Sequence, residues 1–395
     1  MGRVSDYIAE RKKKDPNLRL GSLKEISESQ KLPPMTSGNV VFDYVTSIGG
    51  LPRGVVTEIR GKNSSGKSTL AAMIAAQHQK KVRAGEATGA ILYLDFEYAV
   101  SASYFKSLGL DVDDEETFIY YQPDTLEAGF NLFLDMTREG ILALGVIDSV
   151  AGASAEAEYE ATVGKASVGL KARAFHQGLR MSVGPMKTTG TGLILINHTH
   201  VKIPTSYIEK QLASRGVQED VSPGGTAIEY YTSLRLDLAK PKLVKGEAMD
   251  GLTNEKSKQV TNVDITIKAF KNKIGQPHRE GSMRINFGKG FDPVYSAFHI
   301  LVDHKIIKKK GGGHYTIPEV LTIDDVKIPV GEDSLISAIS DNQEWRAKII
   351  DAASKLVLQQ QVEQSDSEVV ITDIEEYVEE GGDIVNPKTG EVIND

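Results

Sequence analysis

The feature that most constrains this chain of 395 residues is a glycine-rich segment, GKNSSGKST, at residues 61–69. Gly61, Gly66, Lys67 and Ser68 have the spacing G-x-x-x-x-G-K-[ST] of a phosphate-binding loop. The residues before it, from Gly54, form a short, largely apolar run that predicts a buried strand, and those after it have helical apolar spacing. Because a strand, a glycine loop and a helix are the context that such a loop requires, we expect a nucleoside triphosphate site.

The residue types in this loop also predict individual roles. Glycines permit backbone conformations in which consecutive N–H groups ring a phosphate, and the following helix adds its positive N-terminus. We expect Lys67 to contact the β- and γ-phosphates and Ser68 to ligate Mg²⁺. The residues expected to bind the nucleotide are Gly61, Ser64, Ser65, Gly66, Lys67, Ser68 and Thr69.

Three further apolar segments end in polar side chains. One ends at Asp148, where a carboxylate is placed to hold Mg²⁺ with Ser68, and another is followed by Glu97, which is placed to activate the attacking water. The third ends at Asn197 and His198, where a polar group can contact the γ-phosphate. For each acid alone, an ordinary solvent-facing strand end is the alternative; together with the loop, both favour catalysis.

The order of the apolar segments predicts an α/β fold with a mainly parallel central sheet. Helical patterns follow the first three strands, as in crossover connections, whereas shorter links between the later strands predict an antiparallel extension. The expected strands are residues 55–60, 90–95, 143–148, 192–197, 233–238, 263–270 and 282–287. We expect four parts: an N-terminal helical arm (1–37), a core that contains the phosphate-binding loop (38–292), a small C-terminal α/β domain (293–360) and an acidic tail (361–395).

Charge and composition narrow the classes of function. The net charge is −8, but one lysine faces eleven acidic residues from Gln361 onward, so that segment carries −10 and the rest +2. This asymmetry is typical of a nucleic-acid binder with an interaction tail, and a solubilising tail is an equal alternative. The absence of cysteine, of a signal-peptide pattern and of a long apolar run predicts a cytoplasmic protein away from membranes. The pair His198 and His200 lacks a nearby acid that would complete a metal site.

Seven segments in register resemble the bacterial RecA recombinase family. They are GKNSSGKST, LYLDFEYA, YQPDT, VIDSVAG, LILINHT, PGGTAIEYYTSLRLDL and IKAFKNKIGQP, and the similarity covers about residues 35–360. The resemblance implies that residues 38–292 are a RecA-type P-loop ATPase core with DNA-binding loops and that the arm at 1–37 serves oligomerisation. It also implies a bacterial or phage source. It further implies ATP and Mg²⁺ as cofactors. If the protein is encoded by a phage, the expected cytoplasmic location is the cytoplasm of the host.

The resemblance assigns roles within the nucleotide site. Glu97 matches the catalytic glutamate, Asp148 the magnesium-binding aspartate, and Tyr104 the tyrosine that stacks on adenine. His198 stands where RecA usually has the glutamine that senses the γ-phosphate, and Ser101 where an aspartate is typical, which leaves base selectivity open. Lys271 and Lys273 match lysines that reach the γ-phosphate of a neighbouring subunit; a solvated strand end is the alternative.

Two segments, Glu160–Gly169 and Thr199–Gly225, match DNA-binding loops. The resemblance implies phosphate contacts from side chains and backbone amides, and apolar wedges between base triplets; simple loop packing is the alternative for Val168 and the wedges. Neither loop is aromatic, so stacking platforms are missing from them. The DNA-binding residues implied are Arg173, Arg180, Val201, Lys202, Ile203, Gly224 and Gly225.

These observations predict an ATP-dependent homologous recombinase. We expect a DNA-dependent ATPase that forms a helical homo-oligomeric filament on single-stranded DNA, pairs it with duplex DNA and exchanges strands. Single-strand-binding and mediator proteins are further expected partners. A hexameric helicase or translocase on the same core, and a filament protein that binds ATP without turnover, are the alternatives.

Overall fold

The computed structural model describes most of the chain. The described residues are 3–15, 18–29, 32–161, 169–201, 220–221, 223, 225–239, 241–249, 256–324, 326–366, 379–380 and 383–384. Cα proximity groups Met1–Gln361 into one compact unit and Val362–Asp395 into a second. Of the acidic tail, the end of the last helix and one two-stranded pair, β15 (Glu379–Glu380) with β16 (Asp383–Ile384), are described.

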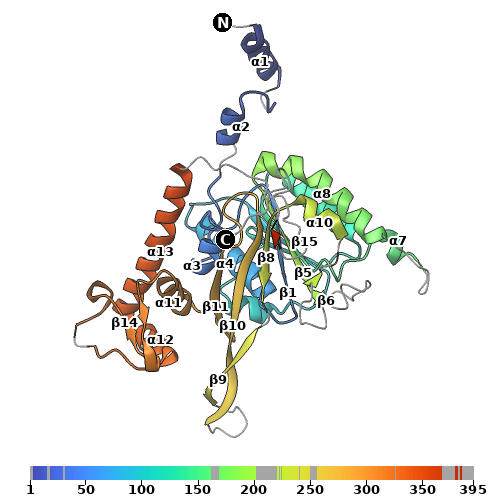
Figure 1. Ribbon diagram of the computed structural model, residues 1–395. Helices are drawn as coiled ribbons and strands as arrows, with labels where there is room; N and C mark the ends of the chain where they lie inside the picture. Colours follow the sequence, from blue (N-terminus) through green and yellow to red (C-terminus); the bar gives the residue numbers. More distant parts are fainter. Residues whose placement is uncertain are drawn as a thin grey trace. The chain divides into compact units, whose positions relative to one another are not determined.

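The centre of the first unit is a 10-stranded sheet in the order β12-β11-β10-β8-β1-β5-β4-β2-β3, with β9 paired to β10 (Figure 1). Its strands are β1 (Val56–Gly61), β2 (Ala90–Asp95), β3 (Phe118–Tyr121), β4 (Leu142–Asp148), β5 (Gly192–His198), β8 (Thr232–Leu238), β9 (Lys242–Met249), β10 (Lys256–Asn272), β11 (Glu280–Asn286) and β12 (Gly290–Phe291). Two short pairs lie outside this sheet: β6 (His200–Val201) with β7 (Asp220–Val221), and β13 (Lys308–Lys309) with β14 (Tyr315–Thr316).

The strand directions confirm the expected mainly parallel sheet. Strands β8, β1, β5, β4, β2 and β3 run parallel, and β9, β10, β11 and β12 form the antiparallel extension. The expected strands agree with the observed ones to within two residues, except that residues 263–270 are the inner part of the much longer β10. The sequence analysis did not predict β3, β9 or β12. Strand β9 pairs with the outer half of β10, and among its described side chains Lys242, Leu243 and Lys245 are exposed, so these positions show no alternation of buried apolar residues.

Helices cover both faces of the sheet. The helices of the described part of the chain are α1 (Arg3–Lys14), α2 (Leu23–Ser29), α3 (Val40–Val45), α4 (Lys67–Arg83), α5 (Ala102–Ser107), α6 (Leu126–Arg138), α7 (Glu156–Tyr159), α8 (Leu170–Thr189), α10 (Gly225–Tyr231), α11 (Pro293–Asp303), α12 (Glu332–Asp341) and α13 (Gln343–Asp366). Two 3₁₀ turns, Gly311–Gly313 and Glu319–Leu321, connect the last elements. The helices expected near the N-terminus and after the phosphate loop are both present.

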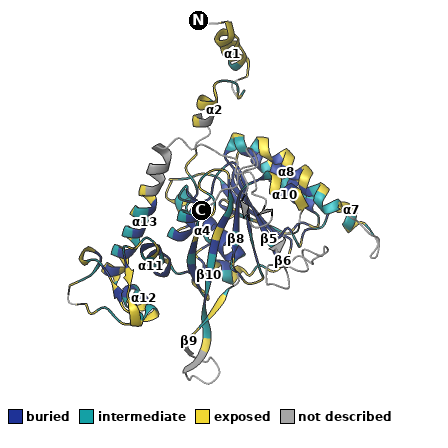
Figure 2. Ribbon diagram, in the orientation of Figure 1, coloured by how far each residue is buried: buried dark blue, intermediate teal, exposed yellow. Residues whose placement is uncertain are grey.

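Two hydrophobic clusters hold these layers together. Along β2, Ile91 and Tyr93 belong to one cluster, and Leu92 and Leu94 belong to the other. The first cluster packs the sheet against α3, α4 and α11, and the second packs it against α6, α8 and α10. Because successive side chains of a strand point to opposite faces, the continuous apolar runs in the sequence reflect burial on both sides. Figure 2 shows this burial in the central strands and the contrasting exposure of α1. Within the described part of the chain, no helix is long and apolar enough to span a membrane.

Helices α6 and α8 pack so closely that a glycine is required between them. A Cβ atom on Gly178 would lie 2.5 Å from Cδ2 of Phe130, whose ring is itself 97% buried against the Phe175 ring at 5.9 Å. We therefore expect Gly178→Ala to lower the free energy of unfolding, because displacing the ring costs about 1–3 kcal/mol. That cost exceeds the gain of about 1 kcal/mol for alanine within a helix.

Urea unfolding of Gly178→Ala checks this expectation. The control is the same substitution in a Phe130→Leu background, where the smaller side chain makes room and Gly178→Ala should be neutral or stabilising. A Gly178→Ala protein that is more stable than the parent in the Phe130 background would contradict the packing.

Candidate functional site

The residues expected at the phosphates and Mg²⁺ within one chain meet at the carboxyl ends of four neighbouring parallel strands. Strands β1, β5, β4 and β2 are adjacent in that order, so the segments that follow them lie along one edge of the sheet. This edge brings together Lys67, Ser68, Glu97, Asp148 and His198, which come from segments far apart in the sequence.

The phosphate loop has the left-handed backbone conformation that its glycine-rich sequence predicts. Gly66, at φ +86°, precedes α4, and Ser64 also has a positive φ of 60°. The Lys67 ammonium group lies inside the loop and donates hydrogen bonds to the backbone oxygens of Gly61 (3.1 Å) and Lys62 (2.9 Å). Burial lowers the pKa of Lys67, while the charges of Asp148 and Glu97 oppose that shift. Ser65 Oγ is buried and has no hydrogen-bond partner among the described residues, which leaves a polar group for a ligand.

A hydroxyl and a carboxylate form the corner expected to hold Mg²⁺. Ser68 Oγ donates to Asp148 Oδ2 at 2.6 Å, and the Tyr93 hydroxyl donates to the same oxygen at 2.6 Å. Burial raises the pKa of Asp148; the bonds from Ser68 and Tyr93 lower it, and the charge of Glu97 raises it further. A cation beside these oxygens would offset the accumulation of negative charge, and oxygen ligands are those that Mg²⁺ prefers. Among the described residues, no cluster of three or more His, Asp or Glu could bind a metal ion by itself.

Glu97 is held by two donors from neighbouring strands. Ser149 Oγ donates to Glu97 Oε1, and His198 Nε2 lies 2.9 Å from the same oxygen. Burial raises the pKa of Glu97, but these bonds and the charge of Lys67 outweigh it, so the net pKa is lowered and the carboxylate is ionised at neutral pH. Glu97 can therefore orient water and accept a proton. His198 Nδ1 is buried and has no partner within the described part of the chain.

Asp95 organises the turn that carries Glu97. Its carboxylate accepts hydrogen bonds from the backbone N–H groups of Glu97 (2.9 Å), Ala99 (3.1 Å) and Val100 (3.2 Å), and from the Tyr120 hydroxyl (2.7 Å). Asp95 is 1% exposed, so these donors replace the water that a buried carboxylate would otherwise require. No role was predicted for Asp95, Ser149, Tyr93 or Tyr120. Asp95 and Ser149 stand at strand ends, which was the one available signal; Tyr93 and Tyr120 lie inside β2 and β3 and had none.

The two residues expected near the adenine base of the nucleotide lie in the first turn of α5 and at its N-cap. The Tyr104 hydroxyl lies 2.7 Å from Thr69 Oγ1, which joins it to the first turn of α4. Ser101 is the N-cap of α5 and accepts a hydrogen bond from the Tyr104 backbone at 3.3 Å. Since serine and aspartate are both good N-caps, the serine at this position keeps the local structure.

The expected DNA-binding and intersubunit residues share a second location, a groove of about 1120 Å³. Its lining includes Arg173, His176 and Arg180 from α8, and Lys271 and Lys273 from the end of β10 and the residue after it. Helix α10 contributes Gly225, Thr226, Ala227, Glu229, Tyr230 and Tyr231. Residue Val201 belongs to β6, while Val168, Lys202, Ile203 and Gly224 lie outside the described residues.

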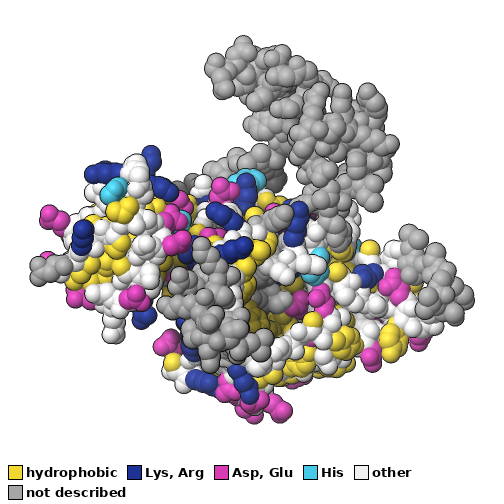
Figure 3. Space-filling model, turned by 90° about the horizontal axis from the view of Figure 1, so that it is seen from below, with side chains coloured by type: hydrophobic (Ala, Val, Ile, Leu, Met, Phe, Trp, Pro, Cys, Tyr) yellow, Lys and Arg dark blue, Asp and Glu magenta, His cyan; other side chains and the backbone are white. Residues whose placement is uncertain are grey.

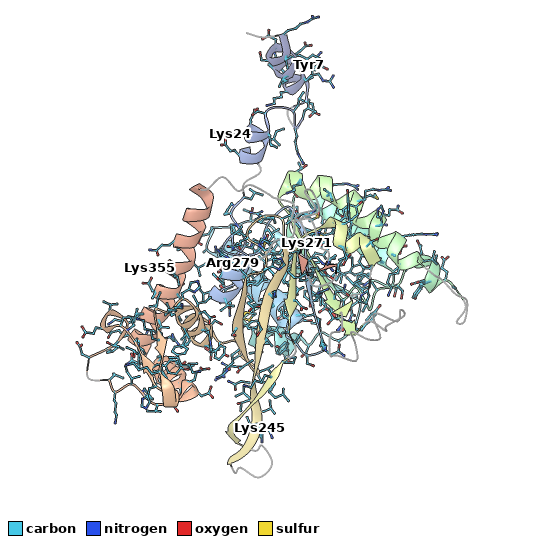
Figure 4. All side chains as sticks on the ribbon, viewed as in Figure 1. Tyr7, Lys24, Lys245, Lys271, Arg279 and Lys355 are labelled. Atoms are coloured by element: carbon cyan, nitrogen blue, oxygen red, sulfur yellow. The ribbon has the colours of Figure 1, made fainter. Side chains whose placement is uncertain are left out.

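Lys271 and Lys273 do not lie beside the phosphate loop of their own chain. In the sheet, Lys271 pairs with Arg235 of β8, and Arg235 pairs with Glu58 of β1, which precedes the loop. Because β10 runs antiparallel to β8, the chain after Lys271 continues away from the loop. Figure 4 shows Lys271 at the opposite end of β10 from the projecting ribbon that contains Lys245. Burial lowers the pKa of Lys271, as do Lys273 and Arg235.

The face of the molecule drawn in Figure 3 mixes both charges. Acidic and basic side chains are interspersed there over the described residues, with hydrophobic side chains between them.

The bonds to Asp95 generate a prediction about positioning. In Asp95→Asn one carboxylate oxygen becomes an NH₂ group, so either the Glu97 N–H or the donors from Ala99, Val100 and Tyr120 face another donor. We expect kcat for ATP hydrolysis to fall about 10–100-fold, with a change in KM for ATP below about threefold, because the turn loses its alignment while the phosphate loop is intact. Tyr120→Phe, which leaves the backbone bonds, is the matched control and should stay within about threefold of the parent kcat. Parental kcat in a folded Asp95→Asn protein would contradict this role.

Comparison with known proteins identifies the family. A model described as the RecA N-terminal domain matches residues 7–292. Protein RecA of Thermus aquaticus is 31% identical over 344 residues, covering 86% of this chain and 91% of the relative. Protein RecA of Deinococcus radiodurans is 31% identical over 333 residues, covering 84% and 82%. The crystal structure of the RadB recombinase aligns with a TM-score of 0.43 at 17% identity over 65% of this chain and 98% of that one, a likeness too low to carry an argument. The family match and the curated relatives show that this chain belongs to the RecA family of ATP-dependent recombinases.

Proposed function

We propose that this protein is a DNA-dependent ATPase that assembles as a helical filament on single-stranded DNA and exchanges strands with a homologous duplex. The observation that supports the proposal is that two groups of charged residues, each with an expected role at ATP, lie apart in one chain. The Lys67, Asp148 and Glu97 corner lies at one edge of the sheet, and Lys271 and Lys273 lie away from it, beside the basic groove. Joining the two groups requires a second copy of the chain.

Each residue of the first group has a role in hydrolysis. Lys67 exchanges its bonds to the loop carbonyls for phosphate oxygens, and Ser68 with Asp148 holds Mg²⁺, which when bound would neutralise charge on the β- and γ-phosphates. Glu97 orients a water and takes its proton, held in place by Ser149 and His198. Because His198 contacts the base directly, it is also positioned to report on the phosphate.

The second group acts on the neighbouring subunit. Lys271 and Lys273 of one chain supply positive charge to the γ-phosphate held by the next, as arginine fingers do. Since the same groove contains Arg173 and Arg180, DNA bound there can organise the lysines. ATP hydrolysis then requires a filament, and base pairing rather than side chains supplies sequence specificity.

The remaining expectations belong to this proposal. DNA phosphates would contact Arg173, Arg180 and the amides of Gly224 and Gly225, and Val201 and Ile203 would separate base triplets with Lys202 between them. The four-part division of the chain, single-strand-binding and mediator partners, and a cytoplasmic location follow the same family pattern. The family match does not favour the helicase alternative, and the assembled Lys67, Glu97 and Asp148 argue against a filament protein without turnover.

Strand exchange tests the function directly. With ATP, Mg²⁺, a circular single strand and a homologous linear duplex, we expect nicked circular duplex to form; a heterologous duplex is the control. Unwinding of a forked duplex without strand exchange would favour the helicase instead.

Two substitutions separate binding from turnover. Glu97→Gln should keep ATP binding and filament formation and reduce hydrolysis about 10²–10⁴-fold, because the geometry is kept and the base is lost. Lys67→Ala should lose both ATP binding and hydrolysis, because the phosphate cation is lost. Nucleotide-binding titrations and steady-state assays with single-stranded DNA measure the two effects. Failure of Glu97→Gln to bind ATP, or near-parental hydrolysis by Lys67→Ala, would refute the assignments.

Mixed filaments test catalysis across the subunit interface. The double variant Lys271→Ala, Lys273→Ala should bind ATP and lose DNA-stimulated hydrolysis. Mixed with an equal amount of Glu97→Gln, it should regain activity, because about one quarter of the interfaces in a random filament combine an intact base with intact lysines. Hydrolysis in the mixture no greater than the sum of the separate variants would show that the lysines do not act in trans.

A further inference from the structure

A buried ion pair lies beneath α10, outside the residues assigned to ATP or DNA. Glu58 of β1 is 0% exposed, and its Oε2 accepts a hydrogen bond from Nε of Arg235 at 2.6 Å. The two residues are neighbours in the parallel β1–β8 register, and the Arg235 side chain is 7% exposed. A fully buried carboxylate on a central strand is costly unless its charge and its lone pairs are satisfied.

On the Glu58 side, hydrogen bonds of Asn197 connect the pair to the nucleotide edge of the sheet and to the second DNA-binding segment. Asn197 Nδ2 donates to Glu58 Oε1 at 2.9 Å and to the backbone oxygen of Pro223 at 2.8 Å. Asn197 is 0% exposed and precedes His198, which contacts the base Glu97. Both hydrogens of the Asn197 amide are thus used, one on the sheet and one on the segment Thr199–Gly225.

On the Arg235 side, hydrogen bonds to Glu229 connect the pair to Lys271, one of the expected intersubunit lysines. Arg235 Nη1 donates to Glu229 Oε1 of α10 at 2.9 Å, and the Lys271 ammonium group donates to the backbone oxygen of Glu229. The Arg235 guanidinium also lies 4.8 Å from the centre of the Phe270 ring, next to Lys271. Glu229 is 59% exposed, so α10 is where this buried network reaches the groove.

We propose that Glu58 and Arg235 are positioning residues that couple the second DNA-binding segment to ATP hydrolysis. The contiguous path runs from Pro223 through Asn197, Glu58, Arg235 and Glu229 to Lys271. Displacement of Pro223 on DNA binding alters the bond that Asn197 shares with Glu58, and Arg235 transmits the change to α10 and Lys271. The inference rests on the proposed function, because DNA stimulation is its readout.

Three substitutions test the path. Glu58→Gln keeps an acceptor for Asn197 and presents an NH₂ group to Arg235; Arg235→Lys keeps the charge but loses the fork that joins Glu58 to Glu229. We expect each to reduce the ratio of ATPase rates with and without single-stranded DNA about tenfold, in kcat rather than in KM for ATP. Glu229→Gln alters an exposed side chain, so it will fold, and it should reduce the ratio about threefold.

Arg284 provides a matched control for the loss of a buried arginine. Its side chain is 8% exposed, it bonds to Asp264 at 2.6 Å and to Asp333 at 2.7 Å, and it lies 4.3 Å from the Tyr295 ring centre. Arg284→Lys removes the same kind of stacked, shared guanidinium from a place away from the path. It should destabilise the fold similarly and leave the stimulation ratio within about twofold of the parent.

The outcomes distinguish the two proposals. Suppose that single-stranded DNA stimulates the parent protein. If the ratio of ATPase rates with and without DNA is then unchanged in Glu58→Gln or Glu229→Gln, or falls equally in Arg284→Lys, the coupling path is overturned and the proposed function stands. A parent that single-stranded DNA does not stimulate overturns both. A double variant, Glu58→Gln with Lys271→Ala, should show no further loss beyond Lys271→Ala alone; fully multiplicative losses would show that Glu58 does not act through Lys271.

Discussion

The site depends on one constraint of the sheet: parallel strands β1, β5, β4 and β2 are neighbours, so their carboxyl ends coincide. Lys67 follows β1, His198 ends β5, Asp148 ends β4 and Glu97 follows β2. The hydrogen bonds between Ser68 and Asp148 and between His198 and Glu97 exist because these ends meet. Burial of the strands on both faces makes that edge rigid, which suits groups that must stay aligned during proton transfer.

The same site concentrates negative charge in a small volume, and the pKa values of its two carboxylates, Asp148 and Glu97, are shifted in opposite directions. Asp148 accepts from Ser68 and Tyr93 and still has a raised pKa, whereas Glu97, with Ser149, His198 and Lys67 nearby, has a lowered one. The difference suits the two carboxylates to different tasks. Asp148 would be completed by a cation, and Glu97 is ionised and can act as a base without one.

The sequence predicted much of this arrangement because its signals are local. The spacing in residues 61–69 identifies the phosphate loop, and apolar runs ending in acids identify Asp148 and Glu97. Partners that are remote in the chain carry no such signal: Ser149 is 52 residues from Glu97, and Arg235 is 177 residues from Glu58. Strand β9 was missed because an exposed ribbon does not require apolar alternation, and β3 because its four residues are too few for periodicity to show.

The exposure of helix α1 determines how easily its backbone hydrogen bonds open. It is 12 residues long and none of them is buried, although Val4 and Tyr7, 72% and 59% exposed, lie one turn apart on the same side. An isolated helix of that length is marginal in water, so its backbone hydrogen bonds open with little free energy unless another surface covers this side. The rate of amide hydrogen exchange in α1 is therefore a direct reporter of whether a second molecule has docked there, independent of any measurement of ATP or DNA.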